Sequence, residues 1–471
     1  MNNESPEFKK SLGLLDATML VAGSMIGSGI FIVSSDIARH TGSAGWLMVV
    51  WLIAGFMTLT AALSYGELSA MFPRAGGQYI YLKEAYSPLV SFTFGWTFFA
   101  VIHTATIAAV GVAFSKFTAY LFPILDEDVI LWSLGTYEIS YAQVLAIAVI
   151  FLLTFINTLG VQNGKTVQTI ITILKLLSLI LLVSFGFWAF DSEVWQSNWA
   201  SENTWKLQNL SKDGAYSDYT MIGALGALSA AMVGALFSSD SWHTSSAVAG
   251  EIKNPKRNIG LSLALGTMIV TVVYLLTNLM YTGVLPLTEM AAAPKDRVAM
   301  VAAQEIFGPV GITILAVMIM VSTFGCNNGL ILAGARIYYS MAQDGLFFKK
   351  TGQLNKNAVP AYALWLQGFV AAAWCLTGRY GDLLDMITCV VVIFYMLCII
   401  GVFILRKKRP DIERPYRAFG YPVLPAIYIV MGLSFIVLLV IYKPQFTWPG
   451  IGITLAGIPL YYLIKKKNQV L

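Results

Sequence analysis

The chain has 471 residues, of which 57% are hydrophobic and 12% are charged, and its mean hydropathy is +0.70. Soluble globular domains carry about 25% charged residues, so this composition excludes a soluble globular protein and indicates one that crosses a membrane many times. The net charge of +5 does not point to nucleic acid, because the Lys and Arg residues lie in short connections between apolar runs.

A glycine-rich stretch, residues 25–30, interrupts the first apolar run. A helix that starts at Leu14 rises about 1.5 Å per residue and reaches this stretch near the middle of a bilayer core about 30 Å thick. Non-helical backbone at that depth persists only where it lines a cavity or binds a ligand. The free amides of Gly27, Ser28 and Gly29 suit an anion, and the carbonyl end of the preceding half-helix suits a cation. We therefore expect a zwitterion, an amino acid or a close analogue, as the ligand.

Twelve apolar runs are long enough to span a membrane. They cover residues of about 14–37, 44–70, 88–122, 139–159, 165–190, 220–249, 259–285, 310–341, 361–377, 382–405, 421–442 and 448–465. An even number of spans places both termini on one side. The connections on that side carry most of the Lys and Arg residues, so we expect both termini to be cytoplasmic.

The sixth run contains a second interruption. Its polar residues, 237–243, lie inside an apolar segment that continues to Gly250. Ser and Asp favour caps over helix interiors, so this pattern predicts a second broken helix. Breaks five helices apart indicate an inverted repeat that binds its substrate at the midplane of the membrane. We divide the chain into residues 1–190 (N-terminal tail and first repeat), 191–405 (outer loop and second repeat) and 406–471 (basic linker and helices 11–12).

Several motifs, taken together in their order and spacing, resemble the amino acid-polyamine-organocation (APC) superfamily and, within it, the L-type amino acid transporter (LAT)-like branch. The matching stretches are residues 26–31, 65–68, 73–79, 175–177, 251–258 and 406–415. The resemblance implies an all-α polytopic membrane protein with the leucine-transporter fold. In that fold, five-plus-five inverted repeats with broken helices 1 and 6 work by alternating access, and the expected activity is exchange or uptake of L-amino acids.

The same resemblance implies a substrate site at the two breaks. It places the substrate carboxylate on the amides of Ser28 and Gly29, and the ammonium near the carbonyls of Met25, Phe237 and Asp240. Phe237 matches the aromatic residue that closes over bound substrate from the outside. The full predicted set of substrate-binding residues is Met25, Ile26, Gly27, Ser28, Gly29, Phe237, Ser238, Ser239 and Asp240.

Lys175 lies about 15 Å past Lys165 along the fifth helix, which is too deep for its ammonium to reach the interface easily. A buried cation must find acceptors or lose its proton. In family members that work without sodium, a lysine here resembles a tethered substitute for the ion, between carbonyls of the first helix and hydroxyls of the eighth. The candidate hydroxyls are those of Ser322 and Thr323. We infer that transport is independent of sodium.

Asp240 departs from the family pattern, which often has glycine at this position. Its carboxylate could contact a cationic side chain of the substrate or accept a proton. It could also cap the second half-helix by bonding the amides of Trp242 or His243. These alternatives leave the size and charge of the substrate open. His103, in the middle of the third span, has two interpretations as well: a proton relay, or a histidine bonded to a neighbouring helix.

Charged residues at the expected inner face, Glu251 and Arg257 among them, match family motifs, and we predict that these two gate the cytoplasmic side together with Phe237 on the outside. The four cysteines lie in apolar segments without the spacing of a metal site, and no motif of a membrane protease or esterase occurs. We therefore expect no cofactor, no metal and no enzymatic activity.

The function that these features predict is secondary transport of neutral L-amino acids by sodium-independent exchange. The alternatives are proton-coupled uptake of cationic amino acids or polyamines, and a nutrient sensor on the same fold that does not transport. Because the outer loop at residues 121–140 has no cysteine, a disulfide-linked heavy subunit is not expected there. We expect a multi-pass protein of the bacterial inner membrane that works as a monomer or a loose oligomer.

Overall fold

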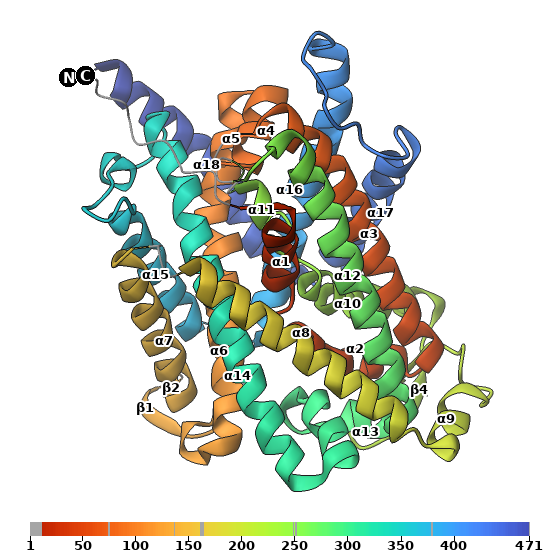
Figure 1. Cartoon of the computed structure of the whole chain (residues 1–471). Coiled ribbons are helices and arrows are strands. Elements are labelled where there is room, and N and C mark those ends of the chain that lie inside the picture. The colour runs from red at the N-terminus through yellow and green to blue at the C-terminus, as the bar shows by residue number, and fades with distance from the viewer. Residues whose placement is uncertain are drawn as a thin grey trace.

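Helices form most of the chain in the computed structural model, which describes residues 12–73, 76–135, 137–160, 164–247, 249, 252–377 and 380–470. The long helices and half-helices are α1 (Leu14–Met25), α2 (Gly29–Thr41), α3 (Ala44–Met71), α5 (Pro88–Thr97), α6 (His103–Leu121), α7 (Tyr141–Thr158), α8 (Gly164–Trp188), α10 (Met221–Ser238), α12 (Pro255–Val284), α14 (Val298–Gln343), α15 (Ala361–Thr377), α16 (Tyr380–Lys408), α17 (Val423–Tyr442) and α18 (Pro444–Val470). They pack into the bundle shown in Figure 1.

Short elements connect these helices. They are α4 (Gln78–Ala85), α9 (Ser192–Trp199), α11 (Thr244–Ala247), α13 (Leu287–Ala292), the π-helical turn η1 (Phe98–Ile102) between α5 and α6, the 3-10 turns η2 (Pro123–Leu125), η4 (Pro294–Asp296) and η5 (Lys349–Gly352), and the strands β1 (Ile130–Leu134), β2 (Tyr137–Ser140), β3 (Gln208–Leu210) and β4 (Tyr216–Asp218). The strands form two antiparallel hairpins, β1–β2 and β3–β4.

Within the described residues, ten helices are long and apolar enough to cross a membrane, and α1 with α2 passes the same test as one span bent by 44°. The shorter apolar helix α15 corresponds to the ninth predicted run. The prediction of an all-α polytopic membrane protein is confirmed. Ten spans, or eleven with the bent pair, meet the test in this part of the chain, and the number twelve stays a prediction. The internal repeat, and the division of the chain at residues 190 and 405, stay predictions.

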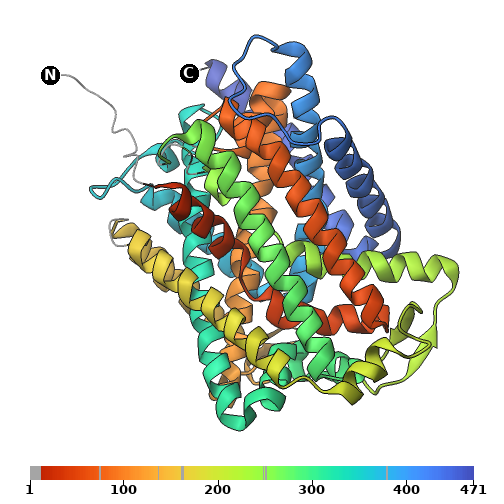
Figure 2. The same ribbon diagram turned by 45° about the vertical axis from the view of Figure 1, so that its right-hand side comes forward.

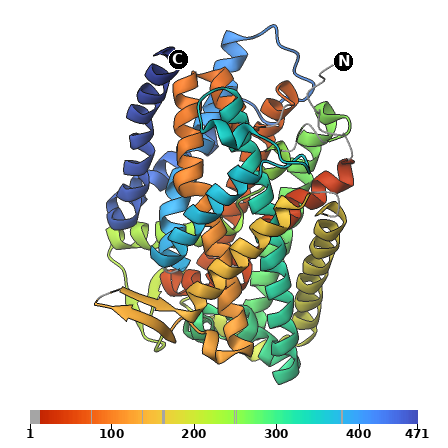
Figure 3. The same cartoon turned by 90° about the vertical axis from the view of Figure 1, so that its left-hand side faces the viewer.

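The bundle has two distinct ends. Helix α18 ends toward the end at which α1 begins, as Figures 1 and 2 show. The β1–β2 hairpin projects from the opposite end (Figure 3), where α9 and α13 also lie. This arrangement agrees with an even number of spans.

The first predicted break is confirmed. Helix α1 ends at Met25, and Ile26 leaves the helical region with φ −75° and ψ 90°. Helix α2 begins at Gly29 with Ser28 as its N-cap residue. The chain enters this break in the interior of the bundle, where α1 packs against α8 and α12 and α2 packs against α10.

The second break is also present, but it begins two residues later than predicted. Phe237 and Ser238 belong to the last turn of α10, and the non-helical segment runs from residue 239 to the start of α11 at Thr244. The hydroxyl of Ser238 donates to the carbonyl of Gly234 at 2.7 Å, so this serine satisfies its polar group without leaving the helix. Ser241 takes a left-handed conformation, with φ 66°, that L-residues rarely adopt.

Candidate functional site

Tyr274 of α12 joins the two breaks. Its hydroxyl oxygen lies 3.1 Å from the carbonyl oxygen of Met25, the last residue of α1, and 3.2 Å from that of Ser238, the last residue of α10. Both carbonyls are at the C-terminal ends of half-helices, where backbone acceptors lack helical partners. One buried phenol therefore holds both interrupted helices at one point.

A cavity of about 320 Å³, which we name the break cavity, lies where these helices meet. It is lined by Ser24, Met25, Gly27, Ser28, Gly29, Thr106, Val110, Phe237, Ser238, Asp240, Ser241, Cys326 and Leu330. Seven of the nine predicted substrate-binding residues are in this lining. The other two, Ile26 and Ser239, are not: Ile26 is fully buried, and Ser239 lines a neighbouring cavity instead.

The backbone of the first break supplies an anion pole to the break cavity. The amide of Gly27 donates to the carbonyl of Met25 at 2.9 Å. The amides of Ser28 and Gly29, at the start of α2, donate to no other backbone group among the described residues. Such free amides at a helix N-terminus attract a carboxylate.

The acceptor pole is less open than predicted. The carbonyl of Met25 already accepts from the amide of Gly27 and from the hydroxyl of Tyr274. The carbonyl of Phe237 accepts from the amides of Ser239 and Asp240. The charged acceptor that lines this cavity is therefore the carboxylate of Asp240.

Lys175 binds the first break from the side of α8. Its ammonium, 2% exposed, donates to the carbonyls of Gly23 at 2.6 Å and Ile26 at 3.0 Å. The expected contacts with α14 are not found among the described residues. Thr323 donates to carbonyls of its own helix, and the hydroxyl of Ser322 is buried without a partner in that part of the chain. The lysine is thus fixed by backbone carbonyls, which carry partial negative charge at the end of a half-helix.

Phe237 and Tyr380 form an aromatic wall at the break cavity. Their ring centroids are 6.2 Å apart in an edge-to-face arrangement, and the hydroxyl of Tyr380 shares a hydrogen bond of 3.0 Å with that of Ser28. Of the two predicted inner-gate residues, Glu251 lies outside the described residues. The side chain of Arg257 is exposed, with no hydrogen bond or ion pair among the described residues, so the predicted gating contact of this arginine is not found.

The carboxylate of Asp240 accepts a hydrogen bond from the hydroxyl of Tyr395 in α16. The predicted cap, a bond from Asp240 to the amides of Trp242 or His243, is not found among the described residues; the carbonyl of Ser241 instead receives the amide of Thr244 at 3.2 Å. The capping interpretation is therefore wrong in this structure. The reason is that the hydroxyl of Tyr395, from α16, donates to the Asp240 carboxylate instead.

Asp240 also borders two further cavities. One, of about 380 Å³, we name the apolar cavity, and its lining is mostly hydrophobic, including Met57, Ala61, Leu236, Ile387, Val391 and Trp242. The other, of about 400 Å³, we name the histidine cavity; it contains His103 and His243 and shares Thr106, Ser241 and Leu330 with the break cavity. Nε2 of His103 lies 2.8 Å from the carbonyl oxygen of Leu330 in α14. This contact agrees with the interpretation of His103 as a histidine bonded to a neighbouring helix.

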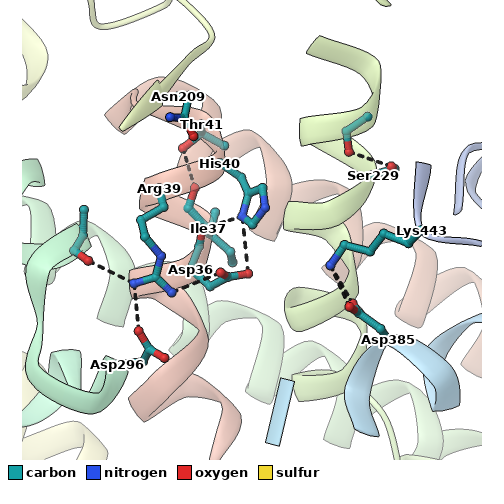
Figure 4. Close-up of polar contacts among 12 residues, drawn as sticks. Asp36, Ile37, Arg39, His40, Thr41, Asn209, Ser229, Asp296, Asp385 and Lys443 are labelled. Carbon is teal, nitrogen blue, oxygen red and sulfur yellow. Dashed lines mark hydrogen bonds and ion pairs between the residues drawn. The ribbon is translucent and has the colours of Figure 1, made fainter. Parts of the chain in front are cut away.

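Ion pairs tie the helices together at the end of the bundle that carries the hairpins. Figure 4 shows Arg39 of α2 between two carboxylates, at 2.8 Å from Asp296 and 3.1 Å from Asp36. The ammonium of Lys443 binds both carboxylate oxygens of Asp385 in α16 at 2.8 Å. The contact of Arg39 with Asp296 joins α2 to η4, and the contact of Lys443 with Asp385 joins the connection between α17 and α18 to α16.

Three tyrosines, Tyr274, Tyr380 and Tyr395, were not predicted from the sequence, although they hold the breaks in place. Tyr274 and Tyr395 lie inside apolar runs, and Tyr380 lies between the ninth and tenth runs. A buried phenol usually requires a hydrogen-bond partner, and that requirement is the signal that could have identified them as candidates. The partners themselves are far away in the sequence, so the sequence alone could not name them.

Several known amino acid transporters are similar to this chain over nearly its whole length. The chain is 29% identical to the serine/threonine exchanger SteT of Bacillus subtilis (strain 168), over 99% of this chain and 100% of that protein. It is 27% identical to the b(0,+)-type amino acid transporter 1 of Mus musculus, over 98% of this chain and 89% of the relative. It is 26% identical to the Asc-type amino acid transporter 1 of Homo sapiens, over 98% and 83% respectively. Residues 12–463 match the amino acid permease family as a whole. The resemblance read from the motifs is thereby confirmed, and the chain belongs to the amino acid permease family.

Proposed function

We propose that the protein is a secondary transporter that exchanges L-amino acids across the membrane without sodium. The observation that carries the proposal is the pair of free amides at Ser28 and Gly29 opposite the carboxylate of Asp240, in one cavity at the interruption of two helices. An L-amino acid has a carboxylate for the first pole and an ammonium for the second. No covalent step is needed for this activity, so the protein is not an enzyme.

Sodium independence is supported by Lys175. Its ammonium donates to two carbonyls beside the first break, which are the kind of ligands that an alkali cation would need. An ammonium at this position satisfies those carbonyls without an added ion. The protein therefore does not require a sodium ion to hold the first break in shape.

Neutral substrates are supported by the walls of the break cavity. Besides Asp240, its side chains are small or uncharged, with Thr106, Val110, Cys326 and Leu330 facing the two breaks. A single carboxylate can pair with the substrate ammonium and so be neutralised. If Asp240 is instead free for the side chain, the alternative is transport of cationic amino acids or polyamines, with or without a proton.

The setting of the protein follows from the same proposal. The SteT relative belongs to a bacterium, and the charge bias of the connections supports a cytoplasmic position for both termini. We propose a multi-pass protein of the bacterial cytoplasmic membrane that needs no disulfide-linked subunit, because residues 121–140 contain no cysteine.

The test is uptake into proteoliposomes that contain the purified protein. We expect saturable uptake of labelled neutral L-amino acids that increases when unlabelled substrate is loaded inside, and that is unchanged when choline replaces sodium. Loss of uptake in choline would disprove sodium independence. Binding without any uptake would favour the sensor, and uptake driven by a pH gradient without internal substrate would favour proton coupling.

A further inference from the structure

A chain of hydrogen bonds connects Asp240 to His243 through Tyr395. The Tyr395 hydroxyl bonds the carboxylate of Asp240 and lies 2.8 Å from Nδ1 of His243. The ring of Tyr395 is 5% exposed and packs edge-on to Tyr65 with centroids 5.8 Å apart. The geometry of these three groups is thus fixed by packing.

The direction of these hydrogen bonds follows from counting protons. A phenol has one proton to donate, and an ionised carboxylate has none. Tyr395 therefore donates to Asp240 and its oxygen accepts from Nδ1–H of His243. In the neutral ring, the proton on Nδ1 leaves Nε2 of His243 with a lone pair. This chain of hydrogen bonds therefore makes Nε2 of His243 a hydrogen-bond acceptor.

His103 is held in the opposite tautomer with the same result. Its Nε2 faces the carbonyl oxygen of Leu330 at 2.8 Å. A carbonyl accepts only, so Nε2 carries the proton and Nδ1 of the neutral ring holds the lone pair. Stacking on Phe98, with centroids 4.5 Å apart, fixes the ring. Both imidazoles line the histidine cavity together with Asp240.

We propose that the histidine cavity is the subsite for the substrate side chain, and that it selects amino acids whose side chain donates a hydrogen bond: a hydroxyl or an amide. The inference rests on the proposed function, because the break cavity must hold the α-carboxylate and α-ammonium for the side chain to enter here. The two cavities share Thr106, Asp240, Ser241 and Leu330, so a substrate bound at the breaks can extend directly into this one.

Tyr395 is a positioning residue in this subsite. It does not line the histidine cavity, but it orients the carboxylate of Asp240 and selects the tautomer of His243. Without the Tyr395 hydroxyl, His243 can move its proton to Nε2, which then becomes a hydrogen-bond donor. The preference for donor side chains should then weaken, although the cavity keeps its shape.

The test compares L-homoserine with O-methyl-L-serine. These are isomers with side chains of equal length, but homoserine donates a hydrogen bond whereas O-methylserine only accepts. In proteoliposomes we expect the wild-type protein to have a lower KM for homoserine. Tyr395→Phe should reduce this preference about two- to tenfold, the effect of one hydrogen bond, by raising the KM for homoserine and leaving that for O-methylserine nearly unchanged.

Tyr338→Phe is the matched control. Tyr338 is fully buried in α14, its hydroxyl has no partner among the described residues, and it lines none of the three cavities. This variant should keep the wild-type ratio. If Tyr395→Phe does not transport, the same ratio is measured as the binding affinity of the purified variant in detergent.

Two results would overturn the inference: equal KM values for the two isomers in the wild-type protein, or an equal change of both in Tyr395→Phe. Failure of the wild-type protein to transport or bind any amino acid would instead overturn the proposed function. The two failures are therefore distinguishable in one set of measurements.

Discussion

The backbone of Gly29 lies directly against Ser238. A Cβ atom added to Gly29 would lie 2.0 Å from Oγ and 2.6 Å from Cβ of Ser238, distances that no real side chain tolerates. The first residue of α2 and the last residue of α10 thus touch, and the two interrupted helices share one contact surface. Glycine is required here for close approach, as well as for access of a ligand to the amides.

The contact predicts that Gly29→Val blocks transport. The branched side chain would collide with Ser238 and also fill the space beside the free amides. Overpacking of this kind costs about 1–3 kcal/mol, so exchange should fall more than about fivefold in proteoliposomes. Gly452→Val is the control, because nothing lies within 4 Å of a Cβ atom added to this exposed glycine of α18. Near-normal exchange by Gly29→Val would contradict the site.

Lys175→Met should abolish exchange and lower stability. The substitution leaves the buried carbonyls of Gly23 and Ile26 without the ammonium to which they are bonded, and an unsatisfied buried acceptor costs about 1–3 kcal/mol. Thermal unfolding in detergent should shift to lower temperature. Transport by the variant at the wild-type rate in choline medium would show that the first break does not depend on this cation.

Both breaks could be predicted because their cause is local. Glycines 27 and 29 weaken a helix by themselves, and so do the Ser and Asp residues that follow Phe237. The exact start of the second break could not be predicted, because Ser238 stays helical while its hydroxyl donates to the carbonyl of Gly234. The tyrosine contacts were also out of reach, since the Tyr274 hydroxyl meets a carbonyl 249 residues away in the chain. Such pairings depend on how helices pack, which hydropathy does not encode.

Bound substrate should protect Cys326 from thiol reagents. All four cysteines are buried, but Cys326 lines the break cavity, with its Sγ 3.6 Å from the carbonyl of Ser24, whereas the other three line none of the three cavities. In a variant that keeps only Cys326, a substrate at ten times its Kd should slow labelling about tenfold by mass action. Labelling that is unaffected by a transported substrate would place the binding site elsewhere.

Lys295→Gln should lower stability in a pH-dependent way. Burial disfavours the charge of Asp126, but the amide of Asp128 and the ammonium of Lys295 outweigh it and lower the pKa of the Asp126 carboxyl. A carboxyl with a lowered pKa contributes stability above its unfolded pKa of about 3.9 and loses it as the pH falls through the folded value.

The variant should therefore unfold at a lower temperature than wild type at pH 7, with a loss below about 1 kcal/mol for this partly exposed group. The difference should shrink as the pH falls below about 4. Lys212→Gln is the control, because Lys212 is 66% exposed and 3.9 Å from Asp296. A difference that stays constant down to acid pH would exclude the carboxyl as its source.

Glu67→Gln should destabilise the fold and leave substrate affinity unchanged. The carboxylate of Glu67, 1% exposed, accepts two bonds from Arg406, at 2.9 and 2.7 Å, and one from the amide of Ala418 at 2.7 Å. It therefore anchors the linker after α16 to α3. Breaking a buried ion pair costs about 3–5 kcal/mol, and the lower end applies because the Arg406 side chain is 24% exposed.

Lys256→Ala is the matched control for Glu67, because the pair of Lys256 and Glu413 is more than half exposed on both sides, at 56% and 72%. An exposed pair contributes about 0–1 kcal/mol. We expect a clear decrease in unfolding temperature for Glu67→Gln, a small one for Lys256→Ala, and an unchanged KM for both. A raised KM with an unchanged unfolding temperature would show that Glu67 gates the inner face, because a structural anchor would change stability first.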